Sequence, residues 1–102
     1  MIRCEPMKGG EQVKVTFAVP KDGVDGQAVA VVGDFNDWDP TATPLRPEGN
    51  LRSATVTLPA GGRYAFRYLA EDGRWFNDED ADDYQQNDFG GDDCVLDLSQ
   101  AG

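Results

Sequence analysis

Apolar and polar residues alternate along several short stretches of the chain with the two-residue period of a β-strand. Residues 12–19 alternate without interruption, which predicts a strand with one buried face. The same pattern returns over residues 51–58 and 63–70. The aromatic residues that share one face of the last stretch, and are therefore predicted to lie in the core, are Tyr64, Phe66 and Tyr68.

A different pattern marks residues 29–40. The first half is a continuous apolar run rich in β-branched side chains, which predicts a strand buried on both faces. The second half turns polar, and Gly33, Asn36 and Pro40 indicate a surface loop. Trp38 lies in this loop among carboxylates, outside any core pattern, so its large ring calls for a separate explanation.

These strands are short and are separated by turns rich in Gly, Pro, Asn and Asp, and no stretch shows sustained helical periodicity. The pattern is typical of an all-β, antiparallel sandwich of about seven strands. We expect a flexible leader over residues 1–11, the sandwich over 12–99 and a tail over 100–102. The acidic segment 77–93 is expected to be irregular.

Composition narrows the classes of function. A chain of 102 residues with 39% hydrophobic residues can form one domain with its own core. The formal charge of -10 argues against nucleic acid and against anionic membranes as partners. We find no apolar run of membrane-spanning length and no secretory signal, so the expected location is cytoplasmic. The chain has no histidine, and neither a metal nor a cofactor is expected.

Two cysteines, Cys4 and Cys94, lie near opposite ends of the chain. In a reducing compartment such residues are expected to be free thiols, although a disulfide stays open at this point.

The two tryptophans suggest a carbohydrate-binding surface. Sugar rings present C–H bonds that pack against an indole face, a contact worth about 1 kcal/mol beyond the area it buries. Arg67 would supply a hydrogen-bond donor to the hydroxyls. The alternative is structural, with Trp75 in the core and Trp38 covering a hydrophobic edge.

The abundant carboxylates raise two further candidates. Paired acids could catalyse glycoside hydrolysis, but nothing in the pattern distinguishes two of the 19 acidic residues from a solvated surface. Calcium is suggested by residues 78–83 together with Asp88, Asp92 and Asp93. This run lacks the spacing and central glycine of an EF-hand loop, so a solvated loop is the interpretation we favour.

Taken in order, the motifs resemble those of the carbohydrate-binding modules of family 48. Val31–Trp38 is similar to the signature of that family, and Leu58–Tyr68 is similar to its proline-glycine turn and aromatic strand. The resemblance continues through Asp72–Trp75 and Asn87–Gly90. These modules are early-set, immunoglobulin-like β-sandwiches at the front of isoamylases, pullulanases and glycogen branching enzymes. They also form the glycogen-binding domain of the β subunit of AMP-activated protein kinase.

The resemblance implies a set of site residues. Trp38 and Trp75 match the two tryptophans that stack on the α-glucan, and Arg67 stands where the kinase subunit has a lysine. Asp93 falls at the place of an asparagine in that site; a carboxylate accepts hydrogen bonds from hydroxyls but cannot donate them. Asn87 is a further possible contact.

We therefore expect a non-catalytic module that binds α-1,4-linked glucans such as glycogen, starch or maltooligosaccharides. Its expected partners are the glucan itself and a glycoside hydrolase or other enzyme of glycogen metabolism. The alternative is a structural or protein-interaction domain that docks on such an enzyme or on a kinase without binding sugar.

Overall fold

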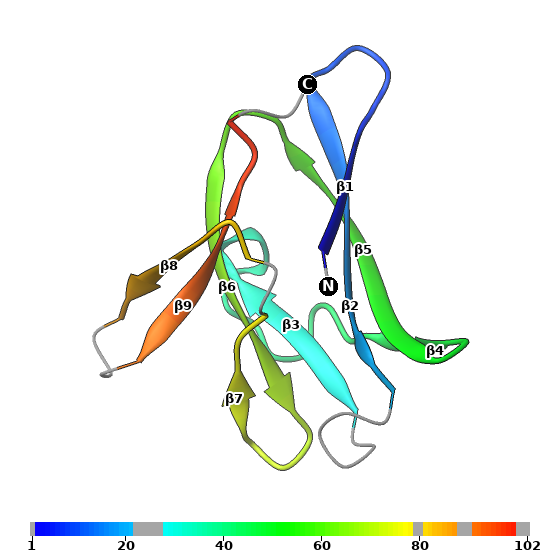
Figure 1. Cartoon of the computed structure of the whole chain (residues 1–102), viewed down its shortest axis with the longest axis vertical. Coiled ribbons are helices and arrows are strands. Elements are labelled where there is room, and N and C mark those ends of the chain that lie inside the picture. The colour runs from blue at the N-terminus through cyan, green and yellow to red at the C-terminus, as the bar shows by residue number, and fades with distance from the viewer. Residues whose placement is uncertain (1, 22–27, 79–80, 88–90, 100–102) are drawn as a thin grey trace.

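The computed structural model describes residues 2–21, 28–78, 81–87 and 91–99, and most of these residues lie in β-strands. The strands form two antiparallel sheets that face each other (Figure 1). This arrangement confirms the predicted all-β, immunoglobulin-like sandwich. The tail 100–102 lies outside the described residues.

One sheet, here called sheet A, has the strand order β1-β2-β5-β4. Its strands are β1 (Ile2–Pro6), β2 (Gln12–Pro20), β4 (Arg46–Glu48) and β5 (Leu51–Pro59). The longest pairing joins β2 to β5 and places Val13 beside Leu58. The inward side chains of β2 are buried, as the alternation of this stretch predicted.

The other sheet, sheet B, has the order β3-β6-β9-β8, and β7 pairs with β6 beyond this path. Its strands are β3 (Val29–Gly33), β6 (Arg63–Ala70), β7 (Trp75–Phe76), β8 (Asp83–Gln86) and β9 (Asp92–Asp97). A 3-10 turn, η2 (Asp34–Asn36), follows β3 directly. In Figure 1 sheet B fills the left side of the molecule and carries β7 and β8 at its margins.

Aromatic rings join the two sheets in the core. Phe17 of sheet A meets Phe66 of sheet B edge to face, with ring centroids 5.0 Å apart, and Phe66 meets Tyr68 at 5.9 Å. All three side chains are buried. Burying each contributes about 1.5–3 kcal/mol to folding. The aromatic row of β6 is therefore core, as predicted, and Tyr64 packs against its margin.

The expectation of a flexible leader over residues 1–11 is wrong for Ile2–Pro6. This segment forms β1 and pairs with β2 along its length, from Ile2 beside Phe17 to Pro6 beside Val13. Four of its five side chains are exposed, so its own hydrophobic pattern gives no strand signal. The backbone hydrogen bonds of the neighbouring strand stabilise it instead.

The acidic segment 77–93 is also more regular than expected. Asp83–Gln86 forms β8, which pairs with β9 although every one of its side chains is exposed. Another short edge strand, β4, forms in the breaker-rich stretch before residue 49. These edge strands bring the described strands to nine, more than the seven expected.

Both cysteines are free, Cys4 exposed and Cys94 buried, which confirms the expectation of thiols. No helix of the described residues is long and apolar enough to cross a membrane. The cytoplasmic location stays a prediction.

Candidate functional site

The loop after β3 presents Trp38 from a backbone that the side chain of Asn36 holds in place. The Asn36 Oδ1 accepts a hydrogen bond from the Gly33 amide at 3.0 Å. Its Nδ2 donates to the Val31 carbonyl and to Thr43 Oγ1, each at 3.0 Å. The Trp38 amide then donates back to the Gly33 carbonyl at 2.9 Å. The turn is therefore closed by its own polar groups.

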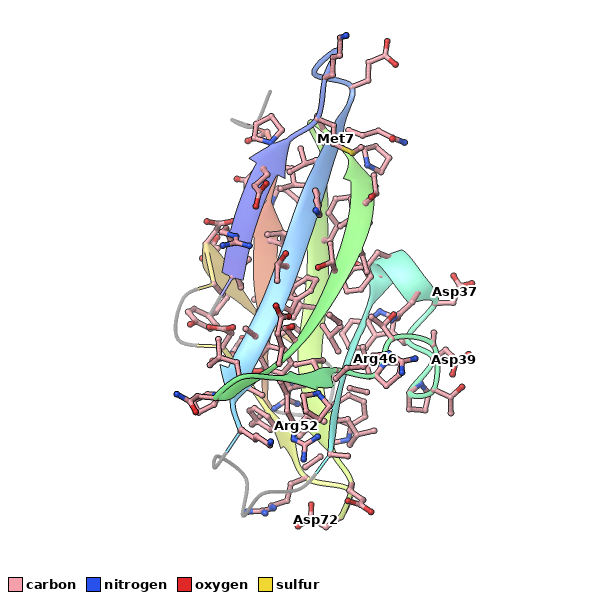
Figure 2. The ribbon with its side chains drawn as sticks, turned by 90° about the vertical axis from the view of Figure 1, so that its right-hand side faces the viewer. Met7, Asp37, Asp39, Arg46, Arg52 and Asp72 are labelled. Carbon is pink, nitrogen blue, oxygen red and sulfur yellow. The ribbon has the colours of Figure 1, made fainter. Side chains whose placement is uncertain are left out.

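Two consecutive residues of this loop adopt left-handed backbone conformations. Asp37 has φ 58° and Trp38 has φ 57°. The left-handed region costs a residue with a Cβ roughly 1–2 kcal/mol, and such strain gathers at functional sites. Figure 2 shows Asp37 and Asp39 projecting outward from the same loop. The Trp38 side chain is half-buried and lines a pocket together with residues of β6, β7, β8 and β9.

Asp34 fixes the indole. Its Oδ1 accepts a hydrogen bond from Trp38 Nε1 at 2.9 Å, and its Oδ2 accepts one from the Ala65 amide at 2.8 Å. The carboxylate thus links the Trp38 ring to β6. Trp38 is half-buried, with its polar edge satisfied within the protein.

Gly33 allows this loop to start close to β6. A Cβ built on Gly33 would lie 2.4 Å from the Ala65 carbonyl oxygen and 2.7 Å from Phe66 Cβ. Both distances are too short for a real Cβ atom, so any side chain at position 33 would clash with β6. The glycine of the Val31–Trp38 signature is thus required by the close approach of β3 and β6.

Trp75 comes from a strand paired with β6, whereas Trp38 follows β3, another strand paired with β6. It lies on β7, paired with Leu69 of β6. In the turn before β7, the Ala70 amide donates to the Arg74 carbonyl and the Gly73 amide donates to the Ala70 carbonyl. The side chain is 44% exposed. The alternative that Trp75 belongs to the core is therefore wrong.

Arg67 lies on β6 beside Trp75, with its guanidinium carbon 6.0 Å from the centre of the indole. Its Nε donates to Asn77 Oδ1 at 3.0 Å. Asn77 Nδ2 in turn donates to the Asp92 carbonyl at 2.8 Å. Arg67 is thereby held between β7 and the start of β9.

Asp93 and Asn87 belong to the hairpin of β8 and β9. Asn87 Nδ2 donates to Asp93 Oδ1 at 3.0 Å, and Asn87 Oδ1 accepts from the Gly91 amide at 3.1 Å. Asp93 is 8% exposed. Asn87 therefore orients the Asp93 carboxylate at the loop end of the hairpin.

These elements surround one open pocket of about 740 Å³. It is lined by Asp34, Trp38, Ala65, Arg67, Trp75, Gln85, Gln86, Asn87 and Asp93. All five residues predicted from the sequence, Trp38, Trp75, Arg67, Asp93 and Asn87, are among them. The two indoles thus belong to one pocket and are not on opposite sides of the sandwich.

Sequence reasoning missed the other lining residues. Asp34 lies within the Val31–Trp38 signature, and its place before the tryptophan was the available signal. Gln85 and Gln86 lie on β8, in a stretch without strand periodicity. Their position follows from the register with β9, where Gln85 pairs with Asp93.

The pocket combines apolar faces with fixed hydrogen-bonding groups. Both oxygens of Asp34 accept internal hydrogen bonds, and an oxygen of Asp93 accepts one from Asn87. Carboxylates held in this way orient the groups that donate to them. The arrangement suits binding of a ring that has both C–H faces and hydroxyls.

Asp78, one of the acidic residues raised as a calcium candidate, has other partners. The Asp78 carboxylate is buried and accepts the Tyr68 hydroxyl at 2.6 Å, while its amide donates to Cys94 Sγ at 3.1 Å. Burial raises the pKa of the Cys94 thiol above its ordinary value. Among the described residues, no three acidic, cysteine or histidine side chains cluster as cation ligands. Residues 79–80 and Asp88 lie outside the described residues.

A family model described as the glycogen recognition site of AMP-activated protein kinase matches residues 13–100. The sequence is also similar to 1,4-alpha-glucan branching enzymes. It is 43% identical over 65 residues to the GlgB enzyme of Nitrobacter winogradskyi, a match that covers 51% of this chain and 9% of the enzyme. It is 39% identical over 67 residues to the GlgB 2 enzyme of Xanthomonas campestris, which covers 64% of this chain and 9% of the enzyme.

The chain thus spans about 9% of the length of these relatives. Among solved structures, the enterobactin esterase FES from Shigella flexneri aligns with a TM-score of 0.71 at 12% identity. That alignment covers 99% of this chain and 33% of the esterase. At such low identity the likeness concerns the fold alone.

Proposed function

The chain belongs to the family of the glycogen recognition site of AMP-activated protein kinase, and we propose that it binds α-1,4-linked glucans by stacking them on Trp38 and Trp75. It is a carbohydrate-binding module, and modules of this family are non-catalytic. Glycogen, starch and maltooligosaccharides are the proposed ligands.

The observation that carries the proposal is the presence of both indoles in one open pocket. Trp75 is 44% exposed. An indole that is this exposed contributes little to folding, which favours a role in binding. Each stacked ring would contribute about 1 kcal/mol beyond the area it buries. One glucan chain is proposed to contact both rings.

The polar groups around the rings supply the hydrogen bonds that a sugar needs. Arg67 is the proposed donor to glucose hydroxyls, with a planar fork where a lysine would have a point charge. Asp93 is the proposed acceptor of hydrogen bonds from hydroxyls, and Asn87 is a secondary contact that also orients Asp93. A hydroxyl left without its partner costs about 1–3 kcal/mol, so these groups select the sugar.

The affinity for a short oligosaccharide is expected to be weak, with a Kd of roughly micromolar to millimolar, because an open site buries little area. Isothermal titration calorimetry with maltoheptaose and β-cyclodextrin tests the proposal. Cellohexaose, which has β-1,4 linkages, is the control ligand and is expected to give no comparable heat.

Alanine variants of the two tryptophans test the stacking. Trp38→Ala and Trp75→Ala are each expected to weaken binding about tenfold or more, since a stacked ring and its buried area are lost. The control is Met7→Ala, which removes an apolar side chain that is 42% exposed and does not line the pocket (Figure 2). Unchanged affinity in both tryptophan variants, or no heat from the unchanged chain, would reject the proposal.

The similarity to small segments of branching enzymes supports a second role. We propose that the module works beside an enzyme of glycogen metabolism, as part of the same protein or as a partner. A pull-down from a glycogen-producing cell tests whether contact with the enzyme survives saturating maltoheptaose and the double tryptophan variant. Contact that survives both would favour the protein-interaction alternative over a link made only through the glucan.

A further inference from the structure

The side-chain amide of Asn77 connects Arg67 to the backbone of β9. Its oxygen accepts from Arg67 Nε at 3.0 Å and its nitrogen donates to the Asp92 carbonyl at 2.8 Å. The reverse orientation would set donor against donor and acceptor against acceptor, so the two partners determine how this amide lies. Both bonded groups belong to strands of sheet B or their ends.

Arg67 extends from this contact toward the pocket. The Cβ position of Gly91, if filled, would lie 3.8 Å from Arg67 Nη1 and 3.6 Å from Asn87 Nδ2. The terminal end of the guanidinium therefore lies toward the Asn87 side of the pocket, while its Nε end is held by Asn77. The guanidinium carbon between these ends lies over the Trp75 indole, 6.0 Å from the ring centre.

An arginine side chain has several rotatable bonds, and a half-buried one at the edge of an open pocket can sample many of its rotamers. A hydrogen bond to Nε removes most of this freedom and leaves the two terminal nitrogens as the donors on the pocket side. A lysine at this position has no group equivalent to Nε, so the contact depends on this chain having arginine. Asn77 itself does not line the pocket.

We propose that Asn77 is a positioning residue, which sets the guanidinium of Arg67 beside Trp75 so that its terminal nitrogens meet the glucan hydroxyls. The proposal rests on the proposed sugar-binding function and adds a residue to it. Asn77 acts through Arg67 and makes no contact with sugar of its own.

A double-mutant cycle tests this, with maltoheptaose titrated into the full chain and the variants Asn77→Ala, Arg67→Ala and their double. Asn77→Ala is expected to weaken binding about three- to tenfold, the effect of one hydrogen bond made to a charged group. In the Arg67→Ala background the same change is expected to alter affinity less than about twofold, because the group through which Asn77 acts is gone. Equal losses in both backgrounds, or no loss in the first, would overturn the proposal.

A conservative variant separates the effect of Asn77 on Arg67 from its effect on the backbone of β9. Asn77→Asp keeps an oxygen that accepts from Arg67 Nε but loses the donor to the Asp92 carbonyl. It is expected to bind maltoheptaose within about threefold of the unchanged chain. Binding as weak as in Asn77→Ala would overturn the proposal, since the anchor to β9 would then be what matters.

The Arg67 Nε–H resonance provides a readout that does not involve sugar. In the unchanged chain and in Asn77→Asp, its exchange with water is expected to be slow, whereas Asn77→Ala should make it fast. Fast exchange in the unchanged chain would overturn the positioning. No heat from the unchanged chain combined with slow exchange would instead reject the sugar-binding function while leaving Arg67 held by Asn77.

Discussion

Trp38 Nε1 donates a hydrogen bond to Asp34 Oδ1 at 2.9 Å. The other oxygen of this carboxylate accepts from the Ala65 amide at 2.8 Å. The Asp34 side chain therefore links the Trp38 indole to the backbone of β6. The indole edge that would otherwise turn toward water is satisfied within the protein. The ring is consequently preorganised before any ligand arrives, which reduces the entropy that binding has to overcome.

The first prediction concerns Asp34→Asn. An asparagine keeps one accepting oxygen but turns an NH₂ group toward a second donor, so one of the two hydrogen bonds is lost. We expect the free energy of unfolding to fall by about 1–3 kcal/mol, because the Ala65 amide is buried. We also expect several-fold weaker glucan binding, since Trp38 loses its fixed orientation. Urea denaturation and calorimetry measure the two effects.

Asp37→Asn is the matched control in the same loop. It removes the same charge from a side chain that projects outward (Figure 2), and asparagine tolerates the left-handed backbone at this position. Its stability is expected to stay within about 0.5 kcal/mol of the unchanged chain. Equal effects of the two variants would indicate that loss of charge, and not loss of the Trp38 contact, is responsible.

The second prediction concerns Gly33→Ala. The added Cβ would meet the Ala65 carbonyl oxygen and Phe66 Cβ at 2.4 and 2.7 Å, so β3 must move away from β6. Overpacking of this kind costs about 1–3 kcal/mol or more. Gly91→Ala is the control, because its Cβ would make only ordinary contacts at 3.6 Å and beyond. Denaturation curves of equal midpoint for the two variants would contradict the packing argument.

Much of the core was predictable because its side chains alternate along their own strands. Phe17 and Phe66 follow this two-residue pattern, and both are buried where the two sheets meet. The edge strands were not predictable. Arg3 and Glu5 on β1 are exposed, and the side chains of β8 are polar throughout. Such strands are specified by pairing with a neighbour, which no local pattern contains.

The candidate site likewise contains residues that the sequence pattern could predict and residues that it could not. Trp38 stood out because a large ring in a polar loop has no core pattern. Gln85 gave no such signal, since its place in the pocket depends on β8 pairing with β9. Asn77 was equally hidden, because its contact with Arg67 joins residues ten positions apart across sheet B. Side chains that act through other side chains require the three-dimensional arrangement.

The third prediction follows from β1. A chain that lacks residues 1–6 is expected to unfold at lower urea concentration than the full chain, because Ile2 packs against the core and the backbone pairing with β2 is lost. The expected loss is about 1–3 kcal/mol, from one partly buried apolar side chain and its strand pairing. Identical denaturation curves would favour the flexible leader that the sequence suggested.

A control separates pairing from charge. Arg3 and Glu5 form an ion pair at 3.1 Å, but both side chains are more than half exposed. An exposed pair of this kind contributes less than about 1 kcal/mol. The variant Arg3→Ala in the full chain is therefore expected to retain nearly all of the stability that the truncation removes.

The fourth prediction concerns pH and Cys94. Burial raises the pKa of this thiol above its ordinary value of 9.0. In the unfolded chain the thiol ionises near the ordinary value, while in the folded chain it keeps its proton to higher pH. The folded state therefore binds more protons in the window that opens at pH 9.0, and stability falls as pH rises through it. Below this window the contribution is fully present.

Cys94→Ser removes the thiol and keeps a side chain of similar size that can still accept from the Asp78 amide. Groups elsewhere titrate equally in both proteins, so the difference between them isolates the thiol. We expect the stability of the unchanged chain to fall more steeply than that of Cys94→Ser as the pH rises above 9.0, measured by urea denaturation at each pH. Parallel pH profiles would mean that the Cys94 thiol ionises as readily in the folded chain as in the unfolded one. Cys4 is present in both proteins, so its ionisation does not contribute to the difference between their pH profiles.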